Sequence, residues 1–169
     1  MLKNINNIIL IGYKASGKTT VGRLLANRLD YEFVDTDELF CAQYKNTPAH
    51  YSKIHGIDAF RLHEAQIIQN LKYSPSRLIA TGGGAVDEID NIKHLQNLGT
   101  LIYLEIDFDK VVERLRIGGY FPSFVTEKHF RRRQQLYQQI AHIQLSIKRE
   151  TPSQVVDKII KRLGVVNGQ

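Results

Sequence analysis

A stretch of eight residues near the start of the chain carries the clearest chemical signal. Residues 12–19 read Gly-Tyr-Lys-Ala-Ser-Gly-Lys-Thr, which matches the phosphate-loop pattern G-x-x-x-x-G-K-[ST]. In such a loop the glycines let backbone N–H groups turn toward phosphate oxygens, the lysine reaches the terminal phosphates and the threonine hydroxyl ligates Mg²⁺. The pattern follows an apolar run and leads into residues with helical spacing, which is the context that the motif requires. We therefore predict a nucleoside-triphosphate site here rather than an ordinary glycine-rich turn.

Two carboxylates, Asp35 and Asp37, follow the apolar run that ends at Val34. Taken alone, they are equally well explained as the cap and the acidic first turn of a helix, which would satisfy both of them. Beside a phosphate loop, a catalytic interpretation gains weight. One carboxylate can hold Mg²⁺, directly or through water, while the other orients an acceptor hydroxyl and accepts its proton.

A helical pattern over residues 57–71 has a charged side chain in an apolar stripe. Glu64 follows Phe60 and precedes Ile67 at the spacing of one helix face. Because an inward carboxylate is costly unless it is paired, we expect Glu64 to pair with Arg61, one turn earlier. The pair is either a partly exposed ion pair of the helix or a support that presents the Arg61 guanidinium to an anionic substrate.

Arg133 lies in a second apolar stripe. It is in line with Phe130 and Tyr137, whereas Arg131 and Arg132 point elsewhere on the same helical pattern. We expect Arg131 and Arg132 on a solvated face. An arginine within an apolar stripe is better explained by a guanidinium that reaches into a cleft.

Three consecutive glycines, Gly82, Gly83 and Gly84, follow an apolar run that ends at Thr81. Glycines at the carboxyl end of a strand let a ligand approach the backbone N–H groups closely. The alternative is a mobile loop without a ligand.

Strand-like and helix-like patterns alternate along the chain, which predicts an α/β fold with helices on both faces of a parallel sheet. The predicted strands cover residues 5–11, 32–34, 78–81, 101–106 and 143–147. The predicted helices cover residues 18–29, 36–45, 57–71, 88–97, 109–116, 127–141 and 153–163. Ser153 is the expected cap of the last helix. The phosphate loop, the aspartate pair and the glycine run all follow predicted strands, and ligands of such sheets bind at the carboxyl ends of the strands.

The bulk composition indicates a small enzyme of one domain, residues 1–169. No stretch rich in Pro, Gly or Ser divides the chain, and its length is enough for a sizeable core. The net charge of +6 comes from scattered basic residues, so we expect no nucleic-acid partner. Cys41 is the sole cysteine, and the first apolar run is too short for a signal peptide or a membrane span. We expect a cytoplasmic monomer without membrane contact.

In this order and spacing, the motifs resemble those of the shikimate kinase family over nearly the full length of the chain. The matching segments are the phosphate loop, Asp35-x-Asp37, Phe60-Arg61-x-x-Glu64, residues 81–84 and residues 133–137. The resemblance implies a three-layer α/β/α P-loop kinase fold with a five-stranded parallel sheet of order 2-3-1-4-5 and a mobile lid at about residues 117–126. It also implies transfer of the ATP γ-phosphate to the 3-hydroxyl of shikimate, a step of aromatic amino-acid biosynthesis, with Mg²⁺ as cofactor.

The resemblance implies a role for each matching residue. The ATP site would comprise Gly12, Ala15, Ser16, Gly17, Lys18, Thr19, Thr20, Arg114 and Pro152, the last two beside the adenine. The acceptor site would comprise Asp37, Arg61, Glu64, Gly82, Gly83, Gly84, Pro122 and Arg133. Thr19 and Asp35 would serve Mg²⁺. Lys18 and Asp37 would be catalytic, with Asp37 as the base and the two arginines holding the shikimate carboxylate.

The lid departs from the pattern of the family. The family has Arg-Pro-Leu-Leu there, with an arginine that reaches the transferring phosphate, whereas this chain has Phe-Pro-Ser-Phe beginning at Phe121. A positive group at this point is worth roughly 10³- to 10⁵-fold in related phosphoryl transfers. Either another cation, such as Arg116, Lys128 or Arg131, replaces it, or the reaction is slow, or the activity has changed.

Two further departures concern the acceptor pocket: Ile57 replaces a usual glutamate, and Ser52 stands where an aromatic residue is common. The leading hypothesis is a shikimate kinase with a variant lid. The alternatives are a kinase for another polyhydroxy acid, such as a gluconate-like one, and a nucleotide- or shikimate-binding protein with weak or no catalysis. A nucleotide switch is disfavoured because the chain has no Asn-Lys-x-Asp guanine motif.

Overall fold

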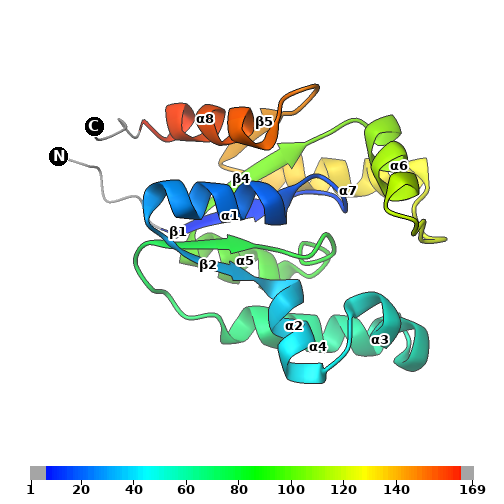
Figure 1. Cartoon of the computed structure of the whole chain (residues 1–169). Coiled ribbons are helices and arrows are strands. Elements are labelled where there is room, and N and C mark those ends of the chain that lie inside the picture. The colour runs from blue at the N-terminus through cyan, green and yellow to red at the C-terminus, as the bar shows by residue number, and fades with distance from the viewer. Residues whose placement is uncertain (1–6, 165–169) are drawn as a thin grey trace.

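Five parallel strands form the sheet in the computed structural model, which describes residues 7–164. Their spatial order is β2-β3-β1-β4-β5 (Figure 1). The strands are β1 (Asn7–Ile11), β2 (Glu32–Asp35), β3 (Arg77–Ala80), β4 (Gly99–Glu105) and β5 (Ile143–Ser146). The predicted strands and their order are confirmed, apart from small shifts at the ends. Residues 5 and 6 of the first predicted strand lie outside the described residues.

Strand β1 is the central strand of the sheet, and every one of its residues is buried. A parallel strand covered by helices on both faces is apolar without alternation, as the run of isoleucines and leucine in β1 is. Ile9 is in register with Ile79 of β3 on one side and with Leu101 of β4 on the other. The loop that follows β1 therefore begins in the middle of the carboxyl edge of the sheet.

Two layers of helices enclose the sheet. The helices are α1 (Lys18–Leu29), α2 (Thr36–Tyr44), α3 (Pro48–His55), α4 (Ile57–Asn70), α5 (Ile89–Leu98), α6 (Phe108–Ile117), α7 (Glu127–Ile140) and α8 (Pro152–Leu163). Helices α1 and α8 pack together on one face, and α5 and α7 contact β4 from the other (Figure 1). This is the expected α/β/α arrangement. Within residues 7–164, no helix combines the length and the apolar character that crossing a membrane requires.

Helix α3 was not predicted from the sequence. It begins after Thr47, whose side chain accepts a hydrogen bond from the N–H of His50, and Pro48 is its first residue. These are ordinary start signals. However, none of the eight residues of α3 is buried, so the helix has no apolar stripe from which its period could be read.

A small aromatic cluster joins α2, α3 and α4 apart from the main core. Its buried members are Phe40, Phe60 and Ile67, against which Tyr44 and Tyr51 pack. The ring of Phe40 meets that of Phe60 edge to face, with 5.1 Å between the ring centroids. These three helices pack against one another next to β2 (Figure 1).

The cap predicted for the last helix was wrong by two residues. Thr151, and not Ser153, caps α8: its hydroxyl accepts from the N–H of Gln154, and the Gln154 side chain accepts from the N–H of Thr151. This reciprocal pair is a capping box. Pro152 then occupies the first helical position, where its missing N–H costs nothing.

Candidate active site

A cavity of about 1250 Å³ opens at the carboxyl ends of the strands. Its walls come from the phosphate loop, the helices α2 to α4, the glycine run after β3, the segment after α6, and α7 and α8. The predicted site residues that line it are Ala15, Ser16, Gly17, Lys18, Thr19, Thr20, Asp37, Arg61, Glu64, Gly82, Gly83, Gly84, Arg114, Arg133 and Pro152. Three further predicted residues, Gly12, Asp35 and Pro122, do not line it.

The phosphate loop is held in shape by its own lysine. The Lys18 ammonium donates to the carbonyl oxygens of Gly12 and Tyr13, at 2.7 and 2.9 Å. Gly12 has a φ of 149°, in the region that favours glycine, and a Cβ there would lie 2.8 Å from the carbonyl oxygen of Leu104. Gly12 therefore lets the loop pack closely against β4, and it does not line the cavity.

Lys18 is a buried cation in this arrangement, with 8% of its surface exposed. Burial lowers the pKa of its ammonium to about 8, against the opposing influence of the Asp37 and Asp35 carboxylates. Its three donors face the two carbonyl oxygens and, at 3.4 Å, the Ser16 hydroxyl. A phosphate group placed in the loop would add negative charge and favour the protonated form.

Thr19 and Asp35 meet as the metal-site prediction requires. The Thr19 hydroxyl donates to Oδ2 of Asp35 at 2.7 Å. The other oxygen of Asp35 accepts the N–H of Asp37 at 2.9 Å and so caps α2. The two interpretations of Asp35, as cap and as metal-side carboxylate, are therefore compatible, because each uses a different oxygen.

The donor set at this point suits Mg²⁺. Mg²⁺ usually binds through one or two carboxylates and substrate phosphates and keeps several waters. A hydroxyl and one carboxylate oxygen beside a phosphate loop fit that pattern. Residues 7–164 contain no group of three or more His, Cys, Asp or Glu side chains that could hold a metal ion.

The Asp37 side chain lines the cavity and lies next to Gly82, the first glycine of the run. Burial among the surrounding walls and the neighbouring Asp35 carboxylate raise the pKa of Asp37, against the opposing charge of Lys18. A Cβ on Gly82 would lie 2.8 Å from Oδ1 of Asp37 and 2.6 Å from Oε1 of Glu64. A side chain at position 82 would therefore displace both carboxylates, and glycine is needed there for this close approach.

The predicted pair of Arg61 and Glu64 is confirmed. Oε2 of Glu64 accepts a hydrogen bond from Nη1 of Arg61 at 2.5 Å, and Glu64 is 4% exposed. Burial raises the pKa of the Glu64 carboxyl, and the Arg61 charge opposes this shift. The other oxygen, Oε1, has no hydrogen-bond partner among the described residues. The Arg61 guanidinium lies directly over Gly84, where a Cβ would approach Nη1 to 2.1 Å.

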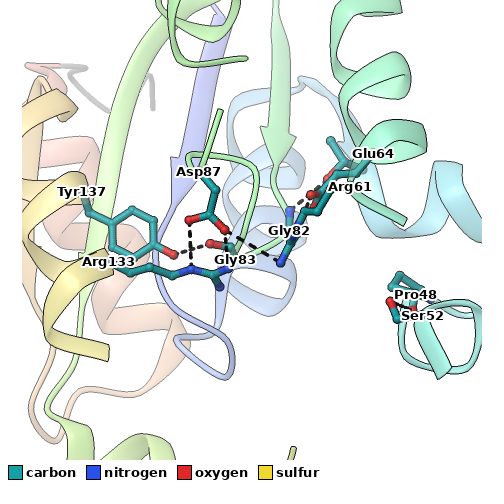
Figure 2. A network of polar contacts seen from close by, with 10 residues as sticks. Pro48, Ser52, Arg61, Glu64, Gly82, Gly83, Asp87, Arg133 and Tyr137 are labelled. Carbon is teal, nitrogen blue, oxygen red and sulfur yellow. Dashed lines mark hydrogen bonds and ion pairs between the residues drawn. The ribbon is translucent and has the colours of Figure 1, made fainter. Parts of the chain in front are cut away.

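Arg133 points into the cavity as predicted, but it is bound to a residue that the sequence analysis missed. Its Nε and Nη2 donate to the two oxygens of Asp87, at 3.2 and 2.6 Å (Figure 2). Nη2 of Arg61 lies 4.0 Å from the same carboxylate. We call Arg61 and Arg133 the arginine clamp. No local pattern marks Asp87, because its partner Arg133 lies 46 residues further along the chain.

Helix α7 connects the acceptor side of the cavity with the phosphate loop. The Tyr137 hydroxyl donates to the carbonyl oxygen of Gly83 at 2.5 Å (Figure 2). About two turns earlier on the same helix, the ring of His129 is hydrogen-bonded to the Tyr13 hydroxyl at 2.7 Å. Tyr13 is 1% exposed, so this bond ties a buried residue of the loop to α7.

The two residues assigned to the adenine also line the cavity. Nη1 of Arg114, on α6, donates to the carbonyl oxygen of Ala15 at 2.8 Å. Pro152 faces the cavity from the start of α8. An arginine and a proline ring offer the flat, partly apolar surfaces on which a base can stack.

Of the lid predicted at about residues 117–126, residue 117 ends α6 and residues 118–126 join α6 to α7. Tyr120 and Phe124 line the cavity, whereas Phe121 does not and is 43% exposed. Pro122 is buried within the segment itself. The Lys14 ammonium lies 5.4 Å from the centroid of the Tyr120 ring, so the phosphate loop and the lid are in contact.

The three cations named as one explanation for the missing lid arginine lie outside the cavity in this structure. Arg116, Lys128 and Arg131 do not line the cavity, and Arg131 is held in an ion pair on its own helix. Lys14 does line it, and the Lys14 charge acts on Asp37. Sequence analysis missed Lys14 because it is one of the variable positions of the phosphate loop.

Known proteins resemble this chain over nearly its whole length. The family model described as shikimate kinase matches residues 14–164. A shikimate kinase of Symbiobacterium thermophilum is 34% identical, covering 93% of this chain and 95% of its own. One of Hahella chejuensis is 32% identical, covering 96% of this chain and 88% of its own.

Solved structures agree with these relatives. A shikimate kinase from Acinetobacter baumannii, in complex with shikimate, has a TM-score of 0.85 at 28% identity, covering 94% of this chain and 93% of that one. A gluconokinase from Sinorhizobium meliloti has a TM-score of 0.63 at 16% identity and shares the fold.

Proposed function

The chain belongs to the shikimate kinase family, and we propose that it transfers the γ-phosphate of ATP to the 3-hydroxyl of shikimate, giving shikimate 3-phosphate and ADP. One observation carries the proposal: a single cavity unites a phosphate loop, a carboxylate of raised pKa and the arginine clamp. The first of these features suits a nucleotide, the second a hydroxyl and the third an acid.

Positioning is the main contribution of the protein to such a transfer. Lys18 and the loop N–H groups hold the ATP phosphates, and Arg114 and Pro152 hold the adenine. Thr19 and Asp35 would hold Mg²⁺, which, when bound, would offset the negative charge of the phosphates. Family membership supports dependence on ATP, and the Thr19–Asp35 pair supports the assignment of Mg²⁺.

Asp37 is the proposed base. In the transfer, the 3-hydroxyl oxygen forms a bond to the γ-phosphorus, the bond to the ADP oxygen breaks, and the hydroxyl proton passes to Asp37. A carboxylate whose pKa is raised by burial accepts a proton more readily than an exposed one. The buried Oε1 of Glu64 faces Gly82 together with Asp37 and has no partner of its own among the described residues, so we assign to it a hydrogen bond donated by a second hydroxyl of the acceptor.

Lys14 is the proposed substitute for the missing lid arginine. It lines the cavity, its charge acts on both Asp37 and Lys18, and it lies against Tyr120 of the lid. A lysine at this place can offset the charge that develops on the transferring phosphate. The cation would then come from the phosphate loop and not from the lid.

Substitution of Lys14 tests this role. We expect Lys14→Met to lower kcat by about 1000-fold, the lower end of the range that one cationic group contributes to phosphoryl transfer, with little change in the KM for shikimate. Lys53→Met is the matched control, because Lys53 lines the same cavity from α3. Adding Phe121→Arg to Lys14→Met should restore part of the rate. A Lys14→Met enzyme with the wild-type kcat would contradict the assignment.

The acceptor is tested by ADP release with ATP, Mg²⁺ and shikimate, beside quinate and gluconate. We expect turnover with shikimate far above the rate without an acceptor. Turnover with gluconate or quinate only would reassign the acceptor. ATP binding without turnover would instead support a binding protein, the alternative that the replacement of the lid arginine by Phe121 favours. A monomer in the cytoplasm is the assembly and location that we propose.

A further inference from the structure

Asp87 fills the space between the two guanidinium groups of the clamp. Its Oδ2 accepts from Nη2 of Arg133 at 2.6 Å and lies 4.0 Å from Nη2 of Arg61, while Oδ1 accepts from Nε of Arg133 at 3.2 Å (Figure 2). Two parallel hydrogen bonds are the way in which a guanidinium binds a carboxylate of any origin. A carboxylate of the protein thus engages the donors that an acidic acceptor needs.

The charges around the clamp balance before any acceptor arrives. Arg61 is paired with buried Glu64, and Arg133 is paired with Asp87. An anionic acceptor would bring a third carboxylate to the two guanidinium groups. The carboxylate of Asp37 lies close by and adds a fourth negative charge. Carboxylates gathered in one partly buried cavity repel one another more strongly than they would in water. The site therefore opposes an acid as long as Asp87 stays in place.

Asp87 is better placed to leave this contact than Arg133 is. The Asp87 side chain retains 20% exposure and lines the cavity, whereas that of Arg133 retains 6%. Asp87 lies in the loop between β3 and α5, where its N–H donates to the carbonyl oxygen of Gly84 at 3.0 Å. A side-chain rotation alone could turn its carboxylate toward solvent without breaking this backbone bond.

We infer that Asp87 competes with the carboxylate of the acceptor for the arginine clamp and so sets the affinity of the acceptor site. The inference rests on the proposed function, in that the acceptor is an acid. Binding then exchanges one ion pair for another: Asp87 releases Arg133, and the acceptor carboxylate takes over its two hydrogen bonds. The apparent affinity is then the intrinsic affinity multiplied by the fraction of molecules in which the clamp is free.

Direct binding of shikimate, measured by calorimetry without nucleotide, tests the competition. We expect Asp87→Asn and Asp87→Ala each to bind shikimate at least about fivefold more tightly than the wild type, since both remove the carboxylate that competes for the clamp. Asp90→Asn is the matched control: it removes the same charge from an exposed position three residues away and should leave the affinity unchanged. Thermal unfolding of each variant checks that the fold is intact.

Two further readouts separate competition from a purely structural role. In turnover assays, the KM for shikimate should fall in both Asp87 variants while the KM for ATP stays constant. The gain should also vanish when Arg133→Ala is added, because the competition acts through that guanidinium. A structural role of Asp87 would predict the opposite sign, with weaker acceptor binding once Arg133 loses its support.

The outcomes distinguish this inference from the proposed function. Equal or weaker shikimate binding by the Asp87 variants overturns the competition, whatever the turnover. Tighter binding supports it even if the wild type proves a poor catalyst. If neither the wild type nor the variants bind shikimate, the competition and the proposed acceptor both fail.

Discussion

The pKa of Lys18 depends strongly on whether the phosphate loop is empty or holds a phosphate group. Burial lowers its pKa to about 8, so the free protein loses this charge above that pH. Bound phosphates would raise the pKa again, because they favour the protonated form. ATP binding should therefore take up a proton at alkaline pH, and the affinity for ATP should fall as the pH rises above 8.

We predict proton uptake on ATP binding at about pH 8.5 and much less at about pH 7, where Lys18 is already protonated. Calorimetry in two buffers of different ionisation enthalpy measures the uptake. ATP itself contributes little at the higher pH, since a terminal phosphate has its second pKa at about 6. The Lys18→Met protein should show no such difference between the two buffers. Equal uptake at both pH values in the wild type would rule out this shift of the Lys18 pKa.

Residue-level features could be predicted from sequence where their geometry is local. The phosphate loop and the pair of Arg61 and Glu64 depend on spacings of a few residues, and helix or turn geometry fixes them. The partner of Arg133 could not be predicted in this way. Asp87 reaches it only because the loop after β3 lies against α7, and that contact depends on the whole fold.

Among the elements, α1 is seated on the sheet through a glycine. A Cβ on Gly22 would lie 2.7 Å from Cε2 of Phe33 and 3.1 Å from Cδ2 of Leu78. Alanine would gain about 1 kcal/mol of helix propensity at this position. Overpacking typically costs about 1–3 kcal/mol, so the packing term is the larger of the two.

We predict that Gly22→Ala lowers the free energy of unfolding by about 1 kcal/mol, the difference between these two effects. Denaturant titration measures it. Gly118→Ala is the control, because Gly118 has a φ of −71° and a Cβ there would only reach ordinary contact at 3.4 Å. Should Gly22→Ala be as stable as the control, α1 would have room to shift away from the sheet.

The elements differ in how far the sequence revealed them. Strands and helices that pack on the core carry an apolar period, and these were predicted to within one or two residues at their ends. Helix α3 has no buried residue and so no period, although its cap at Thr47 and the proline after it could have been recognised. The spatial order of the strands came from the family resemblance, because alternation alone predicts only a parallel sheet.

At the scale of the whole molecule, a single domain should unfold in one cooperative transition. The aromatic cluster of α2, α3 and α4 lies apart from the main core, but α4 also contacts α5, and α2 follows β2 directly. We therefore expect the cluster and the core to unfold together. Calorimetry should show one transition whose calorimetric and van't Hoff enthalpies agree. Two transitions would mean that the cluster of α2, α3 and α4 unfolds separately from the core. The proposed monomer is checked by light scattering at the same concentration, which should report a mass near 19.4 kDa.

Helix α7 has a consequence for how the two substrates affect one another. Through His129 it holds Tyr13 of the phosphate loop, and through Tyr137 it holds the glycine run on the acceptor side. A helix of 14 residues moves as a rod, so a tilt imposed at either contact is felt at the other. Linkage then demands reciprocity: whatever factor ATP contributes to the binding of the acceptor, the acceptor must contribute to the binding of ATP.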